Sequence, residues 1–170
     1  DYVSDHHFMG TDKGGRVDIL HDGEGRYYLG LSIPVMEDEC RLWMVINIEE
    51  MYQKVGSYIR VGDNGYVMIK DSTGRILMHP VQEQIGIDVI EGREAMYPDF
   101  DYSDLQELIN HQLEGREDVE IYHSYWWADE VPRRVLKIGA YTPVRFQDDF
   151  LIVCAVIDYD EIALPFGQAM

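Results

Sequence analysis

The chain has 170 residues, of which 46% are hydrophobic and 12% aromatic, a composition that supports a packed core and excludes a disordered acidic chain. Its 14 basic and 32 acidic residues give a formal net charge of −18, which repels phosphate backbones and anionic lipids, so no nucleic-acid binding or membrane adsorption is expected. The longest apolar run, 150–157, is too short to span a bilayer.

Three β-strands are predicted in the first third of the chain. Segments 16–20, 26–35 and 42–48 are rich in β-branched and aromatic residues, and turn-forming residues separate them. A short helical connection is expected after the third strand, ending at Gly56.

A β-hairpin is predicted next. Two β-prone segments, 66–70 and 75–78, flank the sequence Asp-Ser-Thr-Gly at 71–74. This sequence is typical of a type I turn followed by a glycine at a position of positive φ.

One helix is predicted in the second half, at 103–114. Ser103 is expected to be its N-cap, with Gln106 completing a capping box, and Gly115 is expected to end it. One face of this helix is apolar, formed by Leu105, Leu108, Ile109 and Leu113. Three further strands are expected at 119–127, 134–144 and 150–157.

The two halves of the chain contain an internal repeat. The sequence Gly-Leu-Ser-Ile-Pro-Val at 30–35 corresponds to Gly-Ala-Tyr-Thr-Pro-Val at 139–144, and each is followed by an acidic turn and an apolar strand. We therefore interpret 53–165 as one complete module, preceded at 1–52 by the last three strands of a truncated, similar module. The alternative is that unrelated β-hairpins have similar sequences.

A partial module of three antiparallel strands leaves an open sheet edge with unpaired backbone N–H and C=O groups. This edge must be covered by the complete module, by a second copy of the chain or by strand exchange. A homodimer or a contact between modules is therefore expected.

The hairpin and the closing strands resemble the Cache family of sensor domains. The sequence at 65–80, GYVMIKDSTGRILMHP, followed by IGIDV at 85–89, is similar to the hairpin and "IG" loop of that family, and 140–144 and 158–162 resemble its closing strands and exit. The resemblance implies an α+β fold: a PAS-like antiparallel sheet of five to six strands flanked by helices, here preceded by a partial second β module. Double Cache regions would account for the repeat.

The resemblance also implies a function. Cache domains are extracytoplasmic ligand-sensing regions of receptors that are anchored by transmembrane helices, and their output is usually a histidine kinase, a diguanylate cyclase or a chemotaxis transducer. The expected partner is thus a small-molecule ligand. The family's amino-acid-binding motif, an Arg followed closely by Trp-Tyr with a later Asp, is not found in 1–52, so amino-acid sensing is not expected from that segment.

Two other readings remain open at this point. The chain would be a structural or dimerising membrane-proximal spacer if it has no ligand of its own. It would be a pH sensor if His79 or His123 titrates between about pH 5 and 7.

Catalysis is not expected. The sequence contains no nucleophile elbow, zinc-protease motif, phosphate-binding loop or dinucleotide-binding fingerprint, so no catalytic residues and no cofactor are predicted. No metal site is predicted either, because no spacing of potential ligands favours one. Cys40 and Cys154 are interpreted as free thiols, the alternative being one disulfide.

Five residues are candidates for ligand binding. His79 ends the second hairpin strand and either faces a pocket or caps the strand by bonding the loop. Aromatic side chains with a polar tip suit a small-molecule pocket, but they also suit a packed core. The aromatic candidates are Tyr122, Tyr125, Trp126 and Tyr141.

Overall fold

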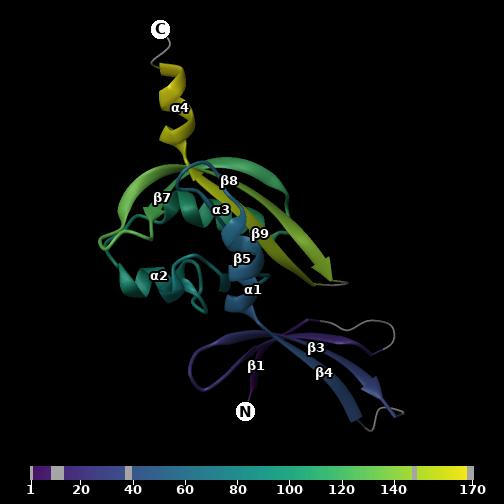
Figure 1. Ribbon diagram of the computed structural model, residues 1–170. Helices are drawn as coiled ribbons and strands as arrows, with labels where there is room; N and C mark the ends of the chain where they lie inside the picture. Colours follow the sequence, from purple (N-terminus) through teal and green to yellow (C-terminus); the bar gives the residue numbers. More distant parts are fainter. Residues whose placement is uncertain (1, 9–13, 37–39, 147–148, 168–170) are drawn as a thin grey trace.

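The computed structural model describes residues 2–8, 14–36, 40–146 and 149–167. These residues form a four-stranded sheet with the order β1-β2-β3-β4 and a five-stranded sheet with the order β6-β5-β9-β8-β7. All neighbouring strands are antiparallel. Helix α1 (Ile48–Val55) joins the two sheets, and β1 and α4 lie at opposite ends of the molecule (Figure 1). The predicted α+β architecture is confirmed, and the larger sheet has five strands.

The N-terminal sheet contains the three predicted strands and one more. Its strands are β1 (Val3–Phe8), β2 (Arg16–His21), β3 (Tyr27–Val35) and β4 (Cys40–Asn47). The sequence did not predict β1, because this segment is largely polar and does not alternate. Helix α1 begins where the Asn47 side chain accepts a hydrogen bond from the Glu50 amide at 3.0 Å, an N-cap of the usual kind.

The C-terminal sheet begins with the predicted hairpin. Asp71 Oδ1 accepts hydrogen bonds from the amides of Thr73 at 2.9 Å and Arg75 at 3.0 Å, and Gly74 has a φ of 93°, which favours glycine. The five strands are β5 (Tyr66–Asp71), β6 (Ile76–Met78), β7 (Asp118–Trp126), β8 (Arg133–Phe146) and β9 (Asp149–Asp158).

Helices α2 (Glu91–Met96) and α3 (Ser103–Leu113) lie on the inner side of the curved sheet (Figure 1). The predicted apolar face of α3 buries Leu105, Leu108 and Ile109 in the main core. The predicted capping box is wrong: Tyr102 is the N-cap and has no side-chain cap bond. Ser103 Oγ instead donates to Asp101 Oδ1 at 2.7 Å, because the tight loop before the helix brings that carboxylate within its reach.

The two sheets are in contact through a second apolar cluster, which contains Ile19, Ile48, Tyr52, Leu77 and Met78. Beside it, the loop after β6 packs against β3. Gly86 has a φ of 87°, and a Cβ atom there would lie 2.3 Å from the Tyr27 ring. The sheets therefore meet closely at Gly86, where a side chain has no room.

Helix α4 (Tyr159–Gly167) continues from β9 and projects from the end of the sheet (Figure 1). Its Glu161 carboxylate accepts hydrogen bonds from the amides of Asp63 at 2.7 Å and Asn64 at 3.1 Å, in the turn before β5. Within the described residues, no helix has the length and apolar character needed to cross a membrane.

The repeated sequences occupy equivalent strands. The segments 30–35 and 139–144 lie in β3 and β8, the middle strands of the meanders β2-β3-β4 and β7-β8-β9. Each meander runs into a helix, α1 or α4. The division into a truncated module at 1–52 and a complete one at 53–165 remains a prediction.

Both cysteines are free thiols, as predicted: Cys40 is exposed and Cys154 is buried.

Candidate ligand-binding site

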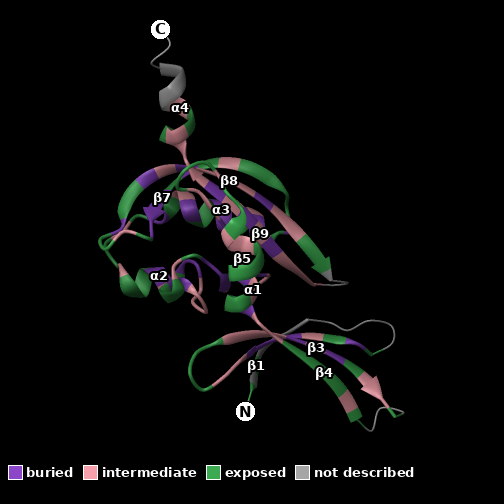
Figure 2. Cartoon of the chain, viewed as in Figure 1, coloured by how far each residue is buried: buried purple, intermediate pink, exposed green. Residues whose placement is uncertain are grey.

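A small cavity lies between the inner face of the C-terminal sheet and helices α2 and α3. Figure 2 shows buried residues on the strands and on α3 in this part of the molecule. The volume of the cavity is about 20 Å³, enough for about one water molecule. Apolar side chains from α3 form one wall, among them Leu105, Leu108 and Ile109. The polar lining comprises Tyr66, Lys70, Arg93, Gln112, Tyr122, Ser124 and Lys137.

Lys70 reaches the cavity from β5. Its side chain is among the most completely buried in the described residues, with an exposed fraction of 2%. The ammonium nitrogen lies 3.2 Å from the sulfur of Cys154 on β9. A thiol is a weak acceptor, so this contact offsets little of the hydration that the ammonium group has lost.

Lys137 reaches the cavity from β8 and is 1% exposed. Its Nζ donates to the Tyr125 carbonyl oxygen at 2.6 Å and lies 4.6 Å from the centroid of the Trp126 ring, a distance at which a cation is attracted to the ring face. Burial lowers the pKa of Lys137 well below 10.5, and the nearby charge of Arg93 lowers it further.

Arg93 extends from α2, in the loop region that follows the hairpin, and is 2% exposed. Its Nε donates to Gln84 Oε1 at 2.8 Å, and its guanidinium lies 4.2 Å from the centroid of the Trp127 ring. The terminal nitrogen Nη2 is buried without a hydrogen-bond partner. Burial lowers the pKa of Arg93 to about 10, so the guanidinium is charged at neutral pH.

The cavity therefore has basic groups without acidic ones. Across the described residues, no Asp or Glu lines it, and no carboxylate forms an ion pair with Lys70, Arg93 or Lys137. Burial raises the pKa of Tyr66 to about 12 and also raises that of Tyr122. Both phenols are thus neutral at pH 7 and add no negative charge.

Two other hollows offer less to a ligand. The larger, of about 220 Å³ between α1 and β5, has an almost wholly apolar lining, including Met51, Val55, Ile59 and Val67. The second, of about 140 Å³, lies beside Ile48, Glu49 and His79. Neither brings several buried polar groups together, and polar groups are what orient a ligand in a binding site.

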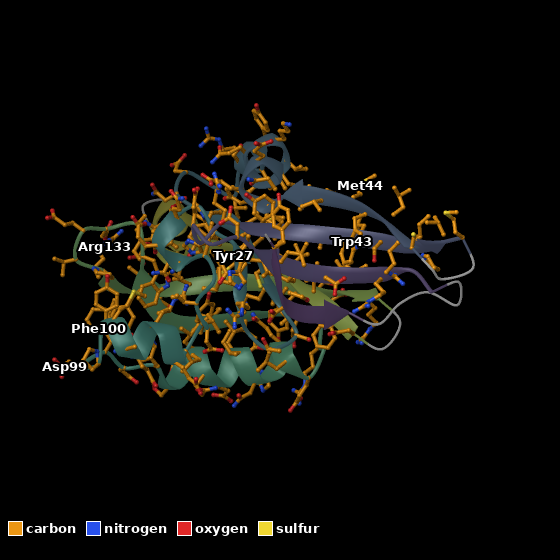
Figure 3. All side chains as sticks on the ribbon, turned by 90° about the horizontal axis from the view of Figure 1, so that it is seen from below. Tyr27, Trp43, Met44, Asp99, Phe100 and Arg133 are labelled. Atoms are coloured by element: carbon orange, nitrogen blue, oxygen red, sulfur yellow. The ribbon has the colours of Figure 1, made fainter. Side chains whose placement is uncertain are left out.

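Of the five residues proposed from the sequence, Tyr122 lines the cavity. Trp126 lies behind it, where its ring faces Lys137. The Tyr125 hydroxyl accepts a hydrogen bond from the Asp101 amide at 2.9 Å. Its ring stacks on that of Phe100, with the centroids 4.0 Å apart. Phe100 and its neighbour Asp99, labelled in Figure 3, belong to the loop before α3. Tyr125 thus supports the loop before α3.

Tyr141 is buried but lies outside the cavity lining, and its hydroxyl donates to the Glu120 carboxylate. His79 is also outside it. Its Nδ1 accepts a hydrogen bond from the Val81 amide at 3.0 Å, which is the strand-capping arrangement, while its Nε2 has no partner. Burial, with the nearby charge of Arg93, lowers the pKa of His79 well below 6.5.

Sequence reasoning missed Lys70, Arg93 and Lys137. A signal for the two lysines is present: each is a single basic residue inside an otherwise apolar strand, in YVMIKD and RVLKIGAY. A lysine at such a position is buried if its strand is central in the sheet. Arg93 has no comparable signal, because it occurs in a short polar segment whose position depends on the fold.

The fold has clear counterparts among solved structures. The periplasmic sensory domain of the Campylobacter jejuni chemoreceptor Tlp1 matches with a TM-score of 0.59 and 13% identity, over 96% of this chain and 50% of that one. The extracellular domain of a protein assigned as the histidine kinase mmHK1S-Z2 matches with a TM-score of 0.55 and 19% identity, over 89% and 53%. The chain thus shares its fold with the periplasmic and extracellular domains of these two receptors.

A third such sensor domain is the ligand-binding domain of the Pseudomonas aeruginosa amino-acid chemoreceptor PctB in complex with L-Arg. It matches with a TM-score of 0.51 and 12% identity, over 95% of this chain and 55% of that one. The chain thus spans about half the length of these structures. No protein-family model matches the sequence, and no curated protein matches it.

Proposed function

We propose that the chain is an extracytoplasmic ligand-sensing region of a membrane-bound receptor and that its ligand binds in the cavity under the C-terminal sheet. The observation that carries the proposal is the convergence of Lys70, Arg93 and Lys137 on this cavity, buried and without a counter-ion in the described residues. Burying unpaired charges is costly. A protein retains such groups where a bound partner offsets that cost, and the sensor-domain fold supports this explanation.

The parent protein, in this proposal, is anchored by transmembrane helices and carries a histidine kinase, diguanylate cyclase or chemoreceptor output. The sensor region itself is non-catalytic. Ligand binding selects one of two conformations, which differ in their affinity for the ligand. Closure of the loop region at 79–102, which carries Arg93, moves the strands that surround the cavity.

Helix α4 is the element through which this movement leaves the domain. Glu161 on α4 bonds the Asp63 and Asn64 amides, and the strand that follows that turn, β5, contributes Tyr66 and Lys70 to the cavity. A shift of β5 is therefore transmitted to α4 by two routes: through the two hydrogen bonds to Glu161, and through β9, which pairs with β5 and continues into α4.

The test is a thermal-shift and calorimetric screen of the purified chain with organic acids, amines, sugars and amino acids. A ligand present at 100 times its Kd stabilises the folded state by about 2.7 kcal/mol. Substituting Arg93 with Gln should abolish the shift. If no compound of any class stabilises the chain, the sensor proposal is wrong.

The exposed apolar strand β4 favours the second candidate, a structural module that dimerises. Leu42 and Met44 are each 61% exposed and Trp43 is 43% exposed, and β4 pairs with β3 alone. Trp43 and Met44 lie along this edge of the molecule, far from Phe100 (Figure 3). We propose that in the isolated chain a second copy covers this edge by β-strand pairing.

Light scattering coupled to size exclusion tests the homodimer, with Met44→Lys as the disrupting variant. The expected result is a dimer for the natural chain and a monomer for the variant. The exposed thiol of Cys40, at the start of β4, can carry a fluorescent label. The label allows the oligomeric state to be measured at low protein concentration. A natural chain that stays monomeric at high concentration contradicts the homodimer but leaves the ligand proposal intact.

A further inference from the structure

Two reactive side chains are buried in contact with each other on neighbouring strands. The side-chain nitrogen of Lys70 on β5 lies 3.2 Å from the sulfur of Cys154 on β9, and each residue is 2% exposed. We infer that Lys70 and Cys154 form an N–O–S bridge on oxidation, in which one oxygen atom joins the lysine nitrogen to the cysteine sulfur. The inference does not depend on the proposed ligand, because it concerns two side chains of the protein itself.

The sheet holds the two atoms together. Strands β5 and β9 are antiparallel neighbours, and Lys70 is paired with Ile152, two positions from Cys154. Both side chains are therefore on the inner face of the sheet, as diagonal neighbours. Within the described residues, the thiol is the only hydrogen-bond partner of the Lys70 nitrogen. Two reactive groups held in this way have a high effective concentration for each other.

The surroundings of Cys154 favour reaction with an amine over reaction with a second thiol. An oxidised cysteine condenses with a neighbouring thiol or with a nitrogen atom. The one other cysteine of the sequence, Cys40, is exposed on β4 in the other sheet. Lys137 also lines the cavity, but its nitrogen bonds the Tyr125 carbonyl oxygen at 2.6 Å. The group that meets oxidised Cys154 is therefore the amine of Lys70.

The cavity limits the size of the oxidant. Lys70 and Cys154 both line the cavity under the C-terminal sheet, whose volume of about 20 Å³ holds about one water molecule. Dioxygen is of nearly that size and is uncharged, so local fluctuations of the core admit it, whereas they exclude bulky disulfide reagents. The geometry also suits an inserted oxygen, because a bridge of one atom spans 3.2 Å with less movement than a direct N–S bond.

The reaction consumes one molecule of dioxygen and no other reactant. The Lys70 amine and the Cys154 thiol lose one hydrogen each, an N–O bond and an O–S bond form, and the O–O bond breaks. One oxygen atom stays in the bridge, and the other leaves as water with the two hydrogens. Nitrogen and sulfur are oxidised and dioxygen is reduced, with a transfer of four electrons. A protonated Lys70 first releases its extra proton to solvent.

The bridge changes the sheet in two ways. It removes the buried positive charge of Lys70, because a nitrogen bonded to oxygen is far less basic than an amine. It also joins β5 covalently to β9, between two residues that are 84 positions apart, and a cross-link over so long a loop restricts the unfolded chain. The oxidised chain is therefore expected to be more stable than the reduced chain. Because β9 continues into α4, the bridge acts on the strand that leads into this helix.

Intact-mass spectrometry tests the bridge on the purified chain in a Cys40→Ser background, which removes the exposed thiol. The chain is reduced with dithiothreitol, freed of the reductant under argon, and incubated in air-saturated or argon-saturated buffer with catalase, which removes peroxide. The expected change in air is a gain of about 14 Da, one oxygen atom less two hydrogens, with no gain under argon.

Three further measurements on the air-treated chain identify the product. Peptide mapping should show the peptides of Lys70 and Cys154 linked to each other. Dithiothreitol should restore the original mass, since four thiol molecules regenerate the amine and the thiol and give two disulfides and one water. The midpoint of thermal unfolding should be higher than that of the reduced chain by about 5–10 °C.

Matched variants identify the two reacting side chains. Lys70→Met and Cys154→Ala should each abolish the gain of about 14 Da. Lys137→Met, the same substitution at the other lysine of the cavity, should retain it. Near-ultraviolet circular dichroism checks that each variant folds, and the peptide map of the chain with both residues intact decides the question without the variants.

Each contrary result has a definite meaning. A chain that gains no mass in air overturns the inference, as does a link that still forms in Lys70→Met. A gain of about 16 or 32 Da at Cys154 without a linked peptide would mean sulfenic or sulfinic acid, and it would overturn the inference too. A loss of about 2 Da with linked peptides would mean a direct N–S bond and no bridging oxygen. None of these results bears on the ligand screen of the proposed function.

Discussion

Strands β4 and β9 end two meanders of the same connectivity, but their surroundings differ. In β9, Ile152, Cys154 and Val156 are 1 to 3% exposed, because β5 and β8 pair with the strand on both sides and helices cover its inner face. In β4, Leu42 and Met44 are 61% exposed, and β3 is the one neighbour in the sheet. An apolar run thus specifies a strand, whereas the elements around the strand decide whether its side chains are buried.

The two sheets also place their buried charged side chains in different surroundings. The N-terminal sheet buries Asp18, whose Oδ1 lies 3.9 Å from a guanidinium nitrogen of Arg16 and 3.5 Å from Ser4 Oγ. In the C-terminal sheet the buried Asp71 accepts hydrogen bonds from the Thr73 and Arg75 amides, whereas Lys70 and Lys137 are buried at a cavity whose described lining contains no acid. The buried acid Asp18 thus has a basic side chain of its own sheet nearby, whereas the two lysines have no counter-ion in the described cavity lining.

The largest expected effect tests the difference between β4 and β9 directly. Ile152→Ala should lower the free energy of unfolding by about 3–4 kcal/mol, because it leaves a cavity in a closed core. Leu42→Ala should change it by less than about 0.5 kcal/mol at low protein concentration. Urea unfolding measures both. A cost of Leu42→Ala that grows with protein concentration would indicate that a second copy covers β4.

The contact between the two sheets gives the second prediction. Gly86→Ala should cost about 2–3 kcal/mol, because the new methyl group meets the Tyr27 ring and the positive φ disfavours a side chain. Gly23→Ala is the matched control, since nothing lies within 4 Å of its added Cβ and its φ is not positive. Equal unfolding free energies for the two variants would mean that the sheets do not pack in solution.

The third prediction concerns the buried charge. Lys137→Met should stabilise the ligand-free chain by roughly 1–2 kcal/mol at pH 7, whereas Lys54→Met, on the exposed face of α1, should have little effect. Because the folded-state pKa of Lys137 is lowered, the unfolded chain binds more protons than the folded chain between that pKa and 10.5.

The stability of the natural chain should therefore rise through this pH range, and the advantage of Lys137→Met should decline toward zero near pH 10.5. Unfolding at several pH values measures this. A constant difference would show that Lys137 is not the titrating group.

The smallest effect is expected at the two hydrogen bonds that join Glu161 of α4 to the turn before β5. Glu161→Gln retains one acceptor oxygen but loses charge assistance to the Asp63 and Asn64 amides, at a cost of about 0.5–1 kcal/mol. Because these bonds are solvent-exposed, hydrogen exchange should increase in 61–65 and at the start of α4 but not in β8. If hydrogen exchange also increased in β8, the two bonds to Glu161 would be shown to stabilise the whole sheet.

Much of the fold could be predicted from local sequence. Asp71 and Gly74 specify their hairpin by short-range bonds and backbone preference, and the apolar face of α3 follows from residue spacing. Ser103 was misassigned because the Asp101 carboxylate competes for the same donors. Strand β1 was missed because its pairing with β2, not its composition, makes it a strand.

The cavity could be predicted only in part. Tyr122 was proposed because an aromatic side chain with a polar tip suits a small-molecule pocket, and it does line the cavity. Lys70 and Lys137 are separated by 67 positions in the sequence (137 − 70), and they share a cavity only because β9 inserts between β5 and β8. Insertion of a late strand between earlier ones is a property of topology, which residue spacing does not encode.

The central position of β9 has a mechanical consequence. Lys70 is paired in register with Ile152 of β9, and Lys137 with Asp158 at the end of the same strand. In the proposed function, a ligand that changes the distance between the two lysines would act on β9 from both of its edges. Helix α4 follows β9 directly after Asp158, so a change in the spacing of these strands would displace α4 along its axis.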